Sequence, residues 1–316
     1  MTGNRRMIAM KTLLLRFAAI TLTACAFATA SIAQAPAQRT FPAPEDAVKA
    51  LVDTVKVGNL DGLLAIFGSG GQELIDSSDA ATARQNQKVF TVAVAERWRL
   101  EDSGTDRKTL IIGNEDWPFP VPIVKDGSAW RFDTVAGKEE ILARRIGRNE
   151  LAAIDTARAY VTAQKRYAEQ GHDGKAAGLY AVKFQSDQGK QNGLYWPAPR
   201  GQKLSPLGDL VAQAAEEGRA VGQSNQPSPL YGYYFKILSG QGPAATGGAK
   251  SYIVKGEMSG GFALVAWPAQ YDATGVMTFI VNQDGVVHEK DLGNGTDAAA
   301  RQMTTYNPDS SWKVTR

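Results

Sequence analysis

The sequence has 316 residues, with 35 basic and 32 acidic side chains and a formal net charge of +3 at pH 7. Four of the basic residues lie within positions 1–35, which hold no acidic residue, so positions 36–316 carry 31 basic against 32 acidic side chains. This balance removes the electrostatic case for nucleic-acid binding, which needs a concentrated positive surface, and the remaining length predicts about two domains.

Residues 1–35 have the order of a bacterial export signal peptide, in which basic residues precede an apolar run that ends in small residues. The basic residues are Arg5, Arg6 and Lys11, and the exit is Ala33-Gln34-Ala35. The apolar run, 12–32, is rich in alanine and interrupted by Arg16, whereas a membrane span needs about 20 strongly apolar residues. We therefore expect a periplasmic or secreted protein with no transmembrane span in the mature chain.

Two features of this leader remain open. Cleavage can follow Ala35 or, because Pro36 is awkward for a signal peptidase, Ala30. Leu22-Thr23-Ala24-Cys25 also resembles the lipobox of bacterial lipoproteins, in which Cys25 would be lipidated and anchor the chain, although the apolar residues after it favour the soluble form. Cys25 is the only cysteine, so no disulfide can stabilise the folded part, which must depend on its core.

The first domain is predicted over residues 36–146, as helices followed by short strands. Apolar residues recur at helical spacing from Ala47 to Val55, after Glu45 and Asp46 and before Gly58. Further helices are expected at 60–67 and 80–98. Strands are expected at 109–112, 121–124 and 130–133, with Asp126-Gly127 as a hairpin turn between the last two.

The second domain is predicted over residues 147–316, as a long helix followed by an antiparallel sheet. The helical pattern covers 139–169, and Gly147 is the expected joint between the domains. Leu151, Ile154, Ala157, Val161 and Ala168 should form its buried stripe, while Asp155, Arg158, Lys165 and Glu169 stay in solvent. Another helix is expected at 207–220. Strands are expected at 230–238, 251–258, 262–267, 276–282 and 286–290, with a hairpin turn at Asp284-Gly285. The fold class is therefore α+β.

Several motifs together resemble a family of exported bacterial proteins known as domain of unknown function twenty-nine fifty. They are Glu115-Asp116-Trp117-Pro118-Phe119-Pro120, Trp130-Arg131-Phe132-Asp133, Arg144-Arg145-Ile146-Gly147-Arg148-Asn149-Glu150, Asn192-Gly193-Leu194-Tyr195-Trp196-Pro197, Gly232-Tyr233-Tyr234-Phe235 and Gly275-Val276-Met277-Thr278-Phe279. The resemblance covers nearly all of the mature chain. It implies export and brings no assigned activity.

Each domain also has a partial resemblance of its own. Helices followed by a meander that ends in a tryptophan strand resemble the small nuclear-transport-factor-like domains. The segment from Asn149 to Tyr167, with the late Asp284-Gly285 turn, resembles the soluble helix and sheet of type IV pilin-like heads. Pilins carry a long apolar stalk before this helix, whereas this chain has charged residues there. The resemblance therefore implies a pilin-like head and gives no support to assembly through a stalk.

No catalytic, metal or cofactor site is predicted. His172 and His288 lie far apart in the sequence and are expected to be ordinary surface residues, because neither has partners at metal-ligand or triad spacing. Ser310-Ser311-Trp312-Lys313 matches the Ser-x-x-Lys motif of penicillin-binding enzymes, but its place near the C-terminus, without companion motifs, favours coincidence.

Aromatic residues are the candidate contacts with a ligand or partner. Tyr233 lies in an alternating aromatic strand, and four others lie beside or close to prolines: Trp117, Phe119, Tyr195 and Trp196. Exposed rings beside rigid prolines can stack on sugars or anchor a protein partner, and packing between domains explains them equally well. We expect a non-enzymatic interaction or scaffold protein of the envelope that binds another envelope protein. The alternative is a protein that binds or cuts peptidoglycan or another cell-wall glycan.

Overall fold

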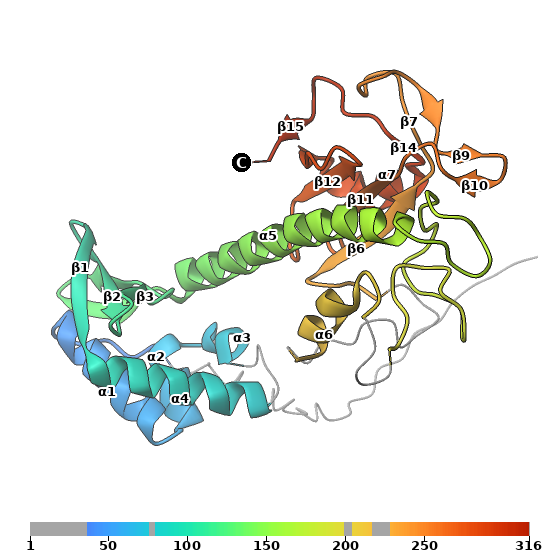
Figure 1. Cartoon of the computed structure of the whole chain (residues 1–316). Coiled ribbons are helices and arrows are strands. Elements are labelled where there is room, and N and C mark those ends of the chain that lie inside the picture. Colours follow the sequence, from blue (N-terminus) through green and yellow to red (C-terminus); the bar gives the residue numbers. More distant parts are fainter. Residues whose placement is uncertain (1–36, 76–79, 199–203, 217–227, 316) are drawn as a thin grey trace, which may run out of the picture.

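The structure is a computed structural model that describes residues 37–75, 80–198, 204–216 and 228–315. The predicted leader and Cys25 lie outside these residues. Two hydrophobic cores are present, one built from residues 41–132 and one from residues 153–306. We call residues 37–132 the N-terminal lobe and residues 153–315 the C-terminal lobe. The helix α5 (Thr134–Ala168) joins them (Figure 1), and the α+β class is confirmed.

The N-terminal lobe packs helices against one antiparallel sheet. The helices are α1 (Pro44–Lys56), α2 (Leu60–Phe67), α3 (Gly71–Ile75) and α4 (Ala80–Glu96). The strands are β1 (Trp98–Gly104), β2 (Arg107–Ile112), β3 (Trp117–Pro118), β4 (Ile123–Asp126) and β5 (Ala129–Phe132), in the order β1-β2-β4-β5 with β3 also paired to β2.

Local signals explain why these first helices begin and end where they do. The α1 helix buries Ala47, Val48 and Leu51 on one face, as their spacing predicted. The Asn59 side chain accepts a hydrogen bond from the Gly62 N–H at 3.0 Å and so caps the start of α2. Gly68, with a φ of 72°, ends α2 in a conformation that favours glycine.

The C-terminal lobe places α5 on a five-stranded antiparallel sheet in the order β15-β13-β12-β11-β6. These strands are β6 (Tyr233–Leu238), β11 (Ala263–Pro268), β12 (Met277–Asn282), β13 (His288–Asp291) and β15 (Lys313–Val314). A smaller sheet joins β14 (Thr305–Tyr306), β7 (Gly240–Gln241) and β8 (Lys250–Ser251), and β9 (Ile253–Val254) pairs with β10 (Glu257–Met258). The remaining helices are α6 (Gly208–Glu216), the short 3₁₀ helix η1 (Gly293–Gly295) and α7 (Thr296–Gln302), which packs on β11.

Several predicted boundaries were wrong. The predicted helix 80–98 ends at Glu96, because Trp98 begins the strand β1, which pairs with β2. The predicted strand 251–258 is broken into β8, β9 and β10: β8 pairs with β7, whereas β9 pairs with β10 across a turn at Lys255 and Gly256, both of which have positive φ. The end of the predicted helix 207–220 lies outside the described residues.

The largest difference concerns α5, which begins at Thr134 and runs through Gly147 without a break. A joint was expected there because glycine weakens helices, but the helix continues between the two lobes. The division of the chain at this residue therefore remains a prediction. Leu151 was also expected in the buried stripe and is 64% exposed, whereas Ile154, Ala157 and Val161 are buried as predicted. Leu151 lies before the point at which α5 reaches the C-terminal core, so no sheet covers it.

Candidate functional site

The five aromatic candidates do not form one site. Trp117 and Phe119 belong to the N-terminal lobe, where Phe119 packs against the core. Tyr195 and Trp196 pack against the core of the C-terminal lobe, and Tyr233 is inside that core. A single aromatic surface built from Trp117, Tyr195 and Trp196 is therefore not present in the structure.

Trp117 is the most exposed of the five, with 44% of its surface accessible. It lies in β3, and the edge of its ring contacts Phe119 at a centroid distance of 6.2 Å. The guanidinium carbon of Arg144, from α5, lies 5.5 Å from the centre of the indole ring. A cation over an indole face is a favourable contact. The exposed ring is thus held where β3 meets α5.

Arg144 is itself held in place by two further contacts. It donates a hydrogen bond to the Pro118 carbonyl at 2.8 Å and another to a Glu140 carboxylate oxygen at 2.7 Å. The Glu140 contact is an i,i+4 ion pair along α5. The sequence pointed to Trp117 but not to Arg144 as its partner, because the two are distant in sequence and meet only when α5 packs beside β3.

The turn before Trp117 is also fixed by charge. Asp116 has a φ of 52°, which is unusual for a residue other than glycine. Hydrogen bonding from Arg99, together with the charges of Arg97 and Arg99, lowers the pKa of the Asp116 carboxyl. Arg97 and Arg99 are therefore paired with a carboxylate beside the indole. The arrangement can stack a flat or apolar group on Trp117.

Trp196 lies in a packed cluster of rings, and Tyr195 packs against the same C-terminal core. Backbone hydrogen bonds of 2.8 Å join Tyr195 to Phe184 and to Ser186, which fixes the loop. The Trp196 ring lies 5.6 Å from the His172 ring, which stacks on Tyr167 at 4.1 Å. Both candidates are half-buried, so they have less surface to offer a ligand than Trp117 has.

The expectation of a surface His172 was wrong, because this side chain is only 5% exposed. Its Nε2 lies 3.0 Å from the Tyr167 carbonyl, and its Nδ1 lies 3.4 Å from the Gln191 amide oxygen. These contacts make it part of the packing around the end of α5. The other histidine, His288, lies in β13 with its Nδ1 3.2 Å from the Tyr306 hydroxyl.

Tyr233 is fully buried, and its ring centre lies 5.7 Å from that of Phe279 with the two rings tilted. Its hydroxyl donates a hydrogen bond to the Met277 carbonyl at 2.9 Å. Burial and the nearby Glu150 carboxylate raise the pKa of Tyr233, because both disfavour a phenolate. A fully buried ring cannot reach a partner at the surface, so Tyr233 acts in packing.

The residues that the sequence reasoning missed are Asn149 and Glu150. Asn149 donates to the Thr274 carbonyl at 2.9 Å. One Glu150 carboxylate oxygen accepts from the Val276 and Met277 N–H groups at 2.9 and 3.0 Å. Together these two residues attach α5 to the start of β12. Both stand in the family motif that begins at Arg144, and Asn149 also begins the segment with the pilin-like resemblance, but neither signal gave these residues a role.

Candidate catalytic features stay separate in the structure. Within the described ranges, no three His, Cys, Asp or Glu side chains are grouped as a metal site requires. Lys313 of the Ser-x-x-Lys match lies in the strand β15, whereas the enzymes' motif opens a helix.

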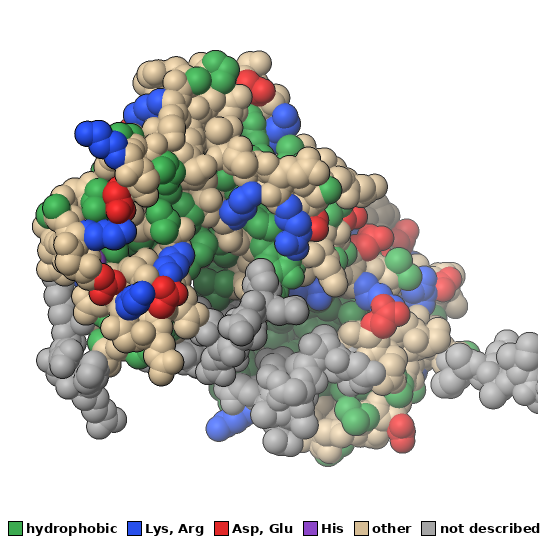
Figure 2. All heavy atoms as spheres, turned by 90° about the vertical axis from the view of Figure 1, so that its right-hand side faces the viewer, with side chains coloured by type: hydrophobic (Ala, Val, Ile, Leu, Met, Phe, Trp, Pro, Cys, Tyr) green, Lys and Arg blue, Asp and Glu red, His purple; other side chains and the backbone are tan. Residues whose placement is uncertain are grey.

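Within the described ranges, no helix has both the length and the apolar character needed to cross a membrane. On the face drawn in Figure 2, basic and acidic side chains are interspersed.

No curated protein and no solved structure matches the chain. The nuclear-transport-factor-like and pilin-like resemblances of the two lobes therefore remain predictions. A family model described as "Protein of unknown function (DUF2950)" matches residues 38–315, and the protein therefore belongs to this family.

Proposed function

We propose that this protein is a non-enzymatic interaction or scaffold protein of the bacterial envelope, with each lobe offering its own binding surface. The observation that carries the proposal is the separation of the two hydrophobic cores along α5. A helix rises 1.5 Å per residue, so the stretch 138–152, in which no residue is buried, spans about 22 Å. One chain can thus hold two contacts at a distance. The leader sequence supports export, in soluble form or anchored through Cys25.

The first test uses a photo-cross-linking amino acid at exposed positions of each lobe in cells that produce the protein. Position 117 reports on the N-terminal lobe, and Val254, which is 46% exposed, reports on the C-terminal lobe. We expect a discrete protein adduct from each lobe. The buried position of Tyr233 serves as the negative control. The absence of adducts from both exposed positions, at normal levels of folded protein, would count against the scaffold proposal.

The alternative is binding to peptidoglycan or another cell-wall glycan through the N-terminal lobe. The observation that favours it is the exposed Trp117 ring, held by Arg144, because an accessible indole can stack on a sugar ring. The alternative therefore proposes a glycan contact at Trp117 alone, because Tyr195 and Trp196 lie in the other lobe.

Sedimentation of the purified protein with isolated peptidoglycan tests this alternative. Trp312→Ala is the matched control, because Trp312 is also a tryptophan beside a cation, with the Lys290 Nζ 5.9 Å from its ring, but it lies in the other lobe. We expect Trp117→Ala to abolish co-sedimentation and Trp312→Ala to preserve it. Equal binding by the wild type and both variants would exclude Trp117 as the glycan contact.

A further inference from the structure

The first part of α5 is attached to the N-terminal lobe. A Cβ at Gly137 would lie 2.7 Å from a Val121 methyl carbon, so the helix packs tightly against the lobe at this point. Lys138 forms an ion pair with Glu73 at 2.9 Å. The last attachment along the helix is Arg144, through its hydrogen bond to Pro118 and its stacking on Trp117.

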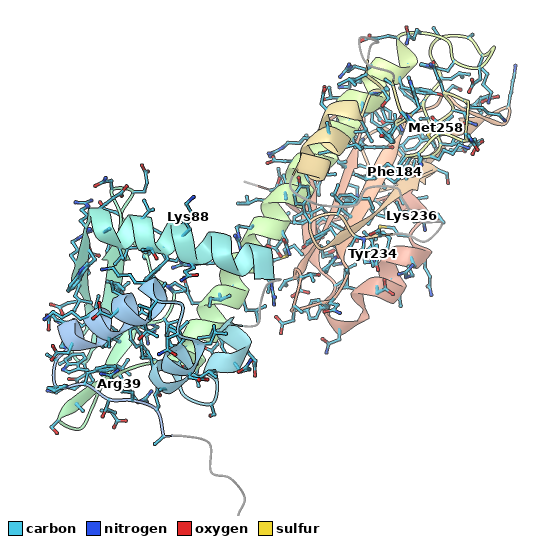
Figure 3. All side chains as sticks on the ribbon, turned by 90° about the horizontal axis from the view of Figure 1, so that it is seen from below. Arg39, Lys88, Phe184, Tyr234, Lys236 and Met258 are labelled. Atoms are coloured by element: carbon cyan, nitrogen blue, oxygen red, sulfur yellow. The ribbon has the colours of Figure 1, made fainter. Side chains whose placement is uncertain are left out.

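The second part of α5 is attached to the C-terminal lobe from Asn149 onward. The Asn149 amide and the Glu150 carboxylate bond to the backbone from Thr274 to Met277. Ala153 is the first residue of α5 in the C-terminal core. Figure 3, which views the molecule from below, places the lobe with Arg39 and Lys88 at one end of this helix and the lobe with Tyr234 and Lys236 at the other.

Four residues between these attachments, Arg145, Ile146, Gly147 and Arg148, make up about one helical turn. None of them is buried. In the part of the chain that the structure describes, none of their side chains forms a hydrogen bond or an ion pair with either lobe. A Cβ at Gly147 would meet no atom within 4 Å. Alanine would fit there and would favour the helix, so packing does not explain the glycine.

We propose that residues 145–148 form a hinge in α5, at which the helix bends and changes the angle between the two lobes. Glycine has the greatest backbone freedom, and it lies in the only turn of α5 between the last N-terminal and the first C-terminal attachment. Because the attachments on either side move with their lobes, a small change of backbone angle here turns one lobe as a body against the other. The inference does not depend on what the lobes bind.

The test measures the distance between the lobes by double electron–electron resonance. Asp53 and Ala298 are exposed helix residues of the N-terminal and C-terminal lobes, and both are replaced by cysteine for spin labelling. Cys25 is the only native cysteine, so a Cys25→Ser background leaves two labelled sites. A pair at positions 53 and 105, both in the N-terminal lobe, gives the width expected without lobe motion.

We expect a broad distance distribution between the lobes in the parent protein and a narrower one in Gly147→Ala. In the double variant Ala143→Gly/Gly147→Ala, the glycine moves one turn back, beside the attached Arg144, and the distribution should stay narrow. The pair within one lobe should not change in any variant.

Three results would overturn the hinge. A parent distribution as narrow as that of the within-lobe pair would show that other contacts hold the lobes together. An unchanged width in Gly147→Ala would show that motion does not depend on this residue. A broad distribution in the double variant would show that any glycine in this part of α5 suffices.

Discussion

Replacing Glu150 by alanine should weaken the C-terminal lobe specifically, because its carboxylate holds the start of β12 against α5. The variant leaves the Val276 and Met277 N–H groups, both partly buried, without the oxygen that accepts from them. A hydrogen bond to a charged group contributes about 1.5–3 kcal/mol. We take the lower value, about 1.5 kcal/mol per bond, because the carboxylate is only half-buried. Loss of both bonds should therefore lower the free energy of unfolding by about 3 kcal/mol.

Glu150→Gln separates the acceptor from the charge. Its amide oxygen can still accept both hydrogen bonds, which become neutral ones of about 1 kcal/mol each, so we expect a loss of about 1 kcal/mol. Arg158→Ala, on the exposed face of the same helix, removes only a surface ion pair with Asp155 and should cost less than about 0.5 kcal/mol.

Urea unfolding followed by the near-ultraviolet circular dichroism of tyrosine measures these losses. All ten tyrosines lie at position 160 or beyond, so the tyrosine part of this signal comes from the C-terminal lobe, whereas Trp98, Trp117 and Trp130 add a tryptophan part from the N-terminal lobe. Because the protein has two hydrophobic cores, the two lobes can unfold in separate transitions. In Glu150→Ala, only the transition reported by tyrosine should move to a lower urea concentration. A shift in Glu150→Ala no larger than that in Arg158→Ala would refute the attachment that we assign to this carboxylate.

Three further predictions follow from burial and packing. Burial raises the pKa of Tyr252 and Tyr306 to about 12, whereas a tyrosine in the unfolded chain loses its proton near pH 10. The C-terminal lobe should therefore keep its stability below about pH 10 and lose it as the pH rises toward 12. Tyrosinate absorbance during an alkaline titration checks this, and ionisation of all ten tyrosines near pH 10 in the folded protein would contradict it. Gly137→Ala should destabilise the N-terminal lobe by about 1–3 kcal/mol, because the new Cβ would overlap Val121. Gly147→Ala should instead stabilise the protein by up to about 1 kcal/mol, because alanine favours the helix and meets no atom there. Thermal unfolding measures both changes in stability, and equal effects of the two variants would rule out the packing argument. Trp117→Ala should cost only about 1 kcal/mol, the size of an exposed cation–π contact, and a larger loss in denaturant unfolding would mean that the ring serves mainly the core.

The local elements of this protein follow from its sequence because their causes lie within a few residues. The α1 helix follows from Ala47, Val48 and Leu51 at helical spacing, and α2 follows from the apolar run before Gly68. The hairpin between β12 and β13 forms around Asp284-Gly285, where Gly285 has a φ of 81°. Membership of the family was also readable from motifs alone. In each case a short window contains all the residues that decide the outcome.

The candidate site depended on contacts between distant residues, which a single sequence does not reveal. Trp117 and Tyr233 look alike as aromatic residues in distinctive motifs, yet one ring is 44% exposed and the other is fully buried. The difference arises because β6 pairs with β11 inside the C-terminal lobe, whereas β3 is a two-residue strand beside α5.

The course of α5 was also decided by tertiary structure. Gly147 predicted a break by helix propensity, but a propensity cost of about 1 kcal/mol is small beside the attachments made by Arg144 on one side and Glu150 on the other. Those attachments extend the helix through the glycine and leave Leu151 in solvent. The sequence by itself determined where helices and strands can form, and the packing of the two lobes along α5 determined which side chains remain available for binding.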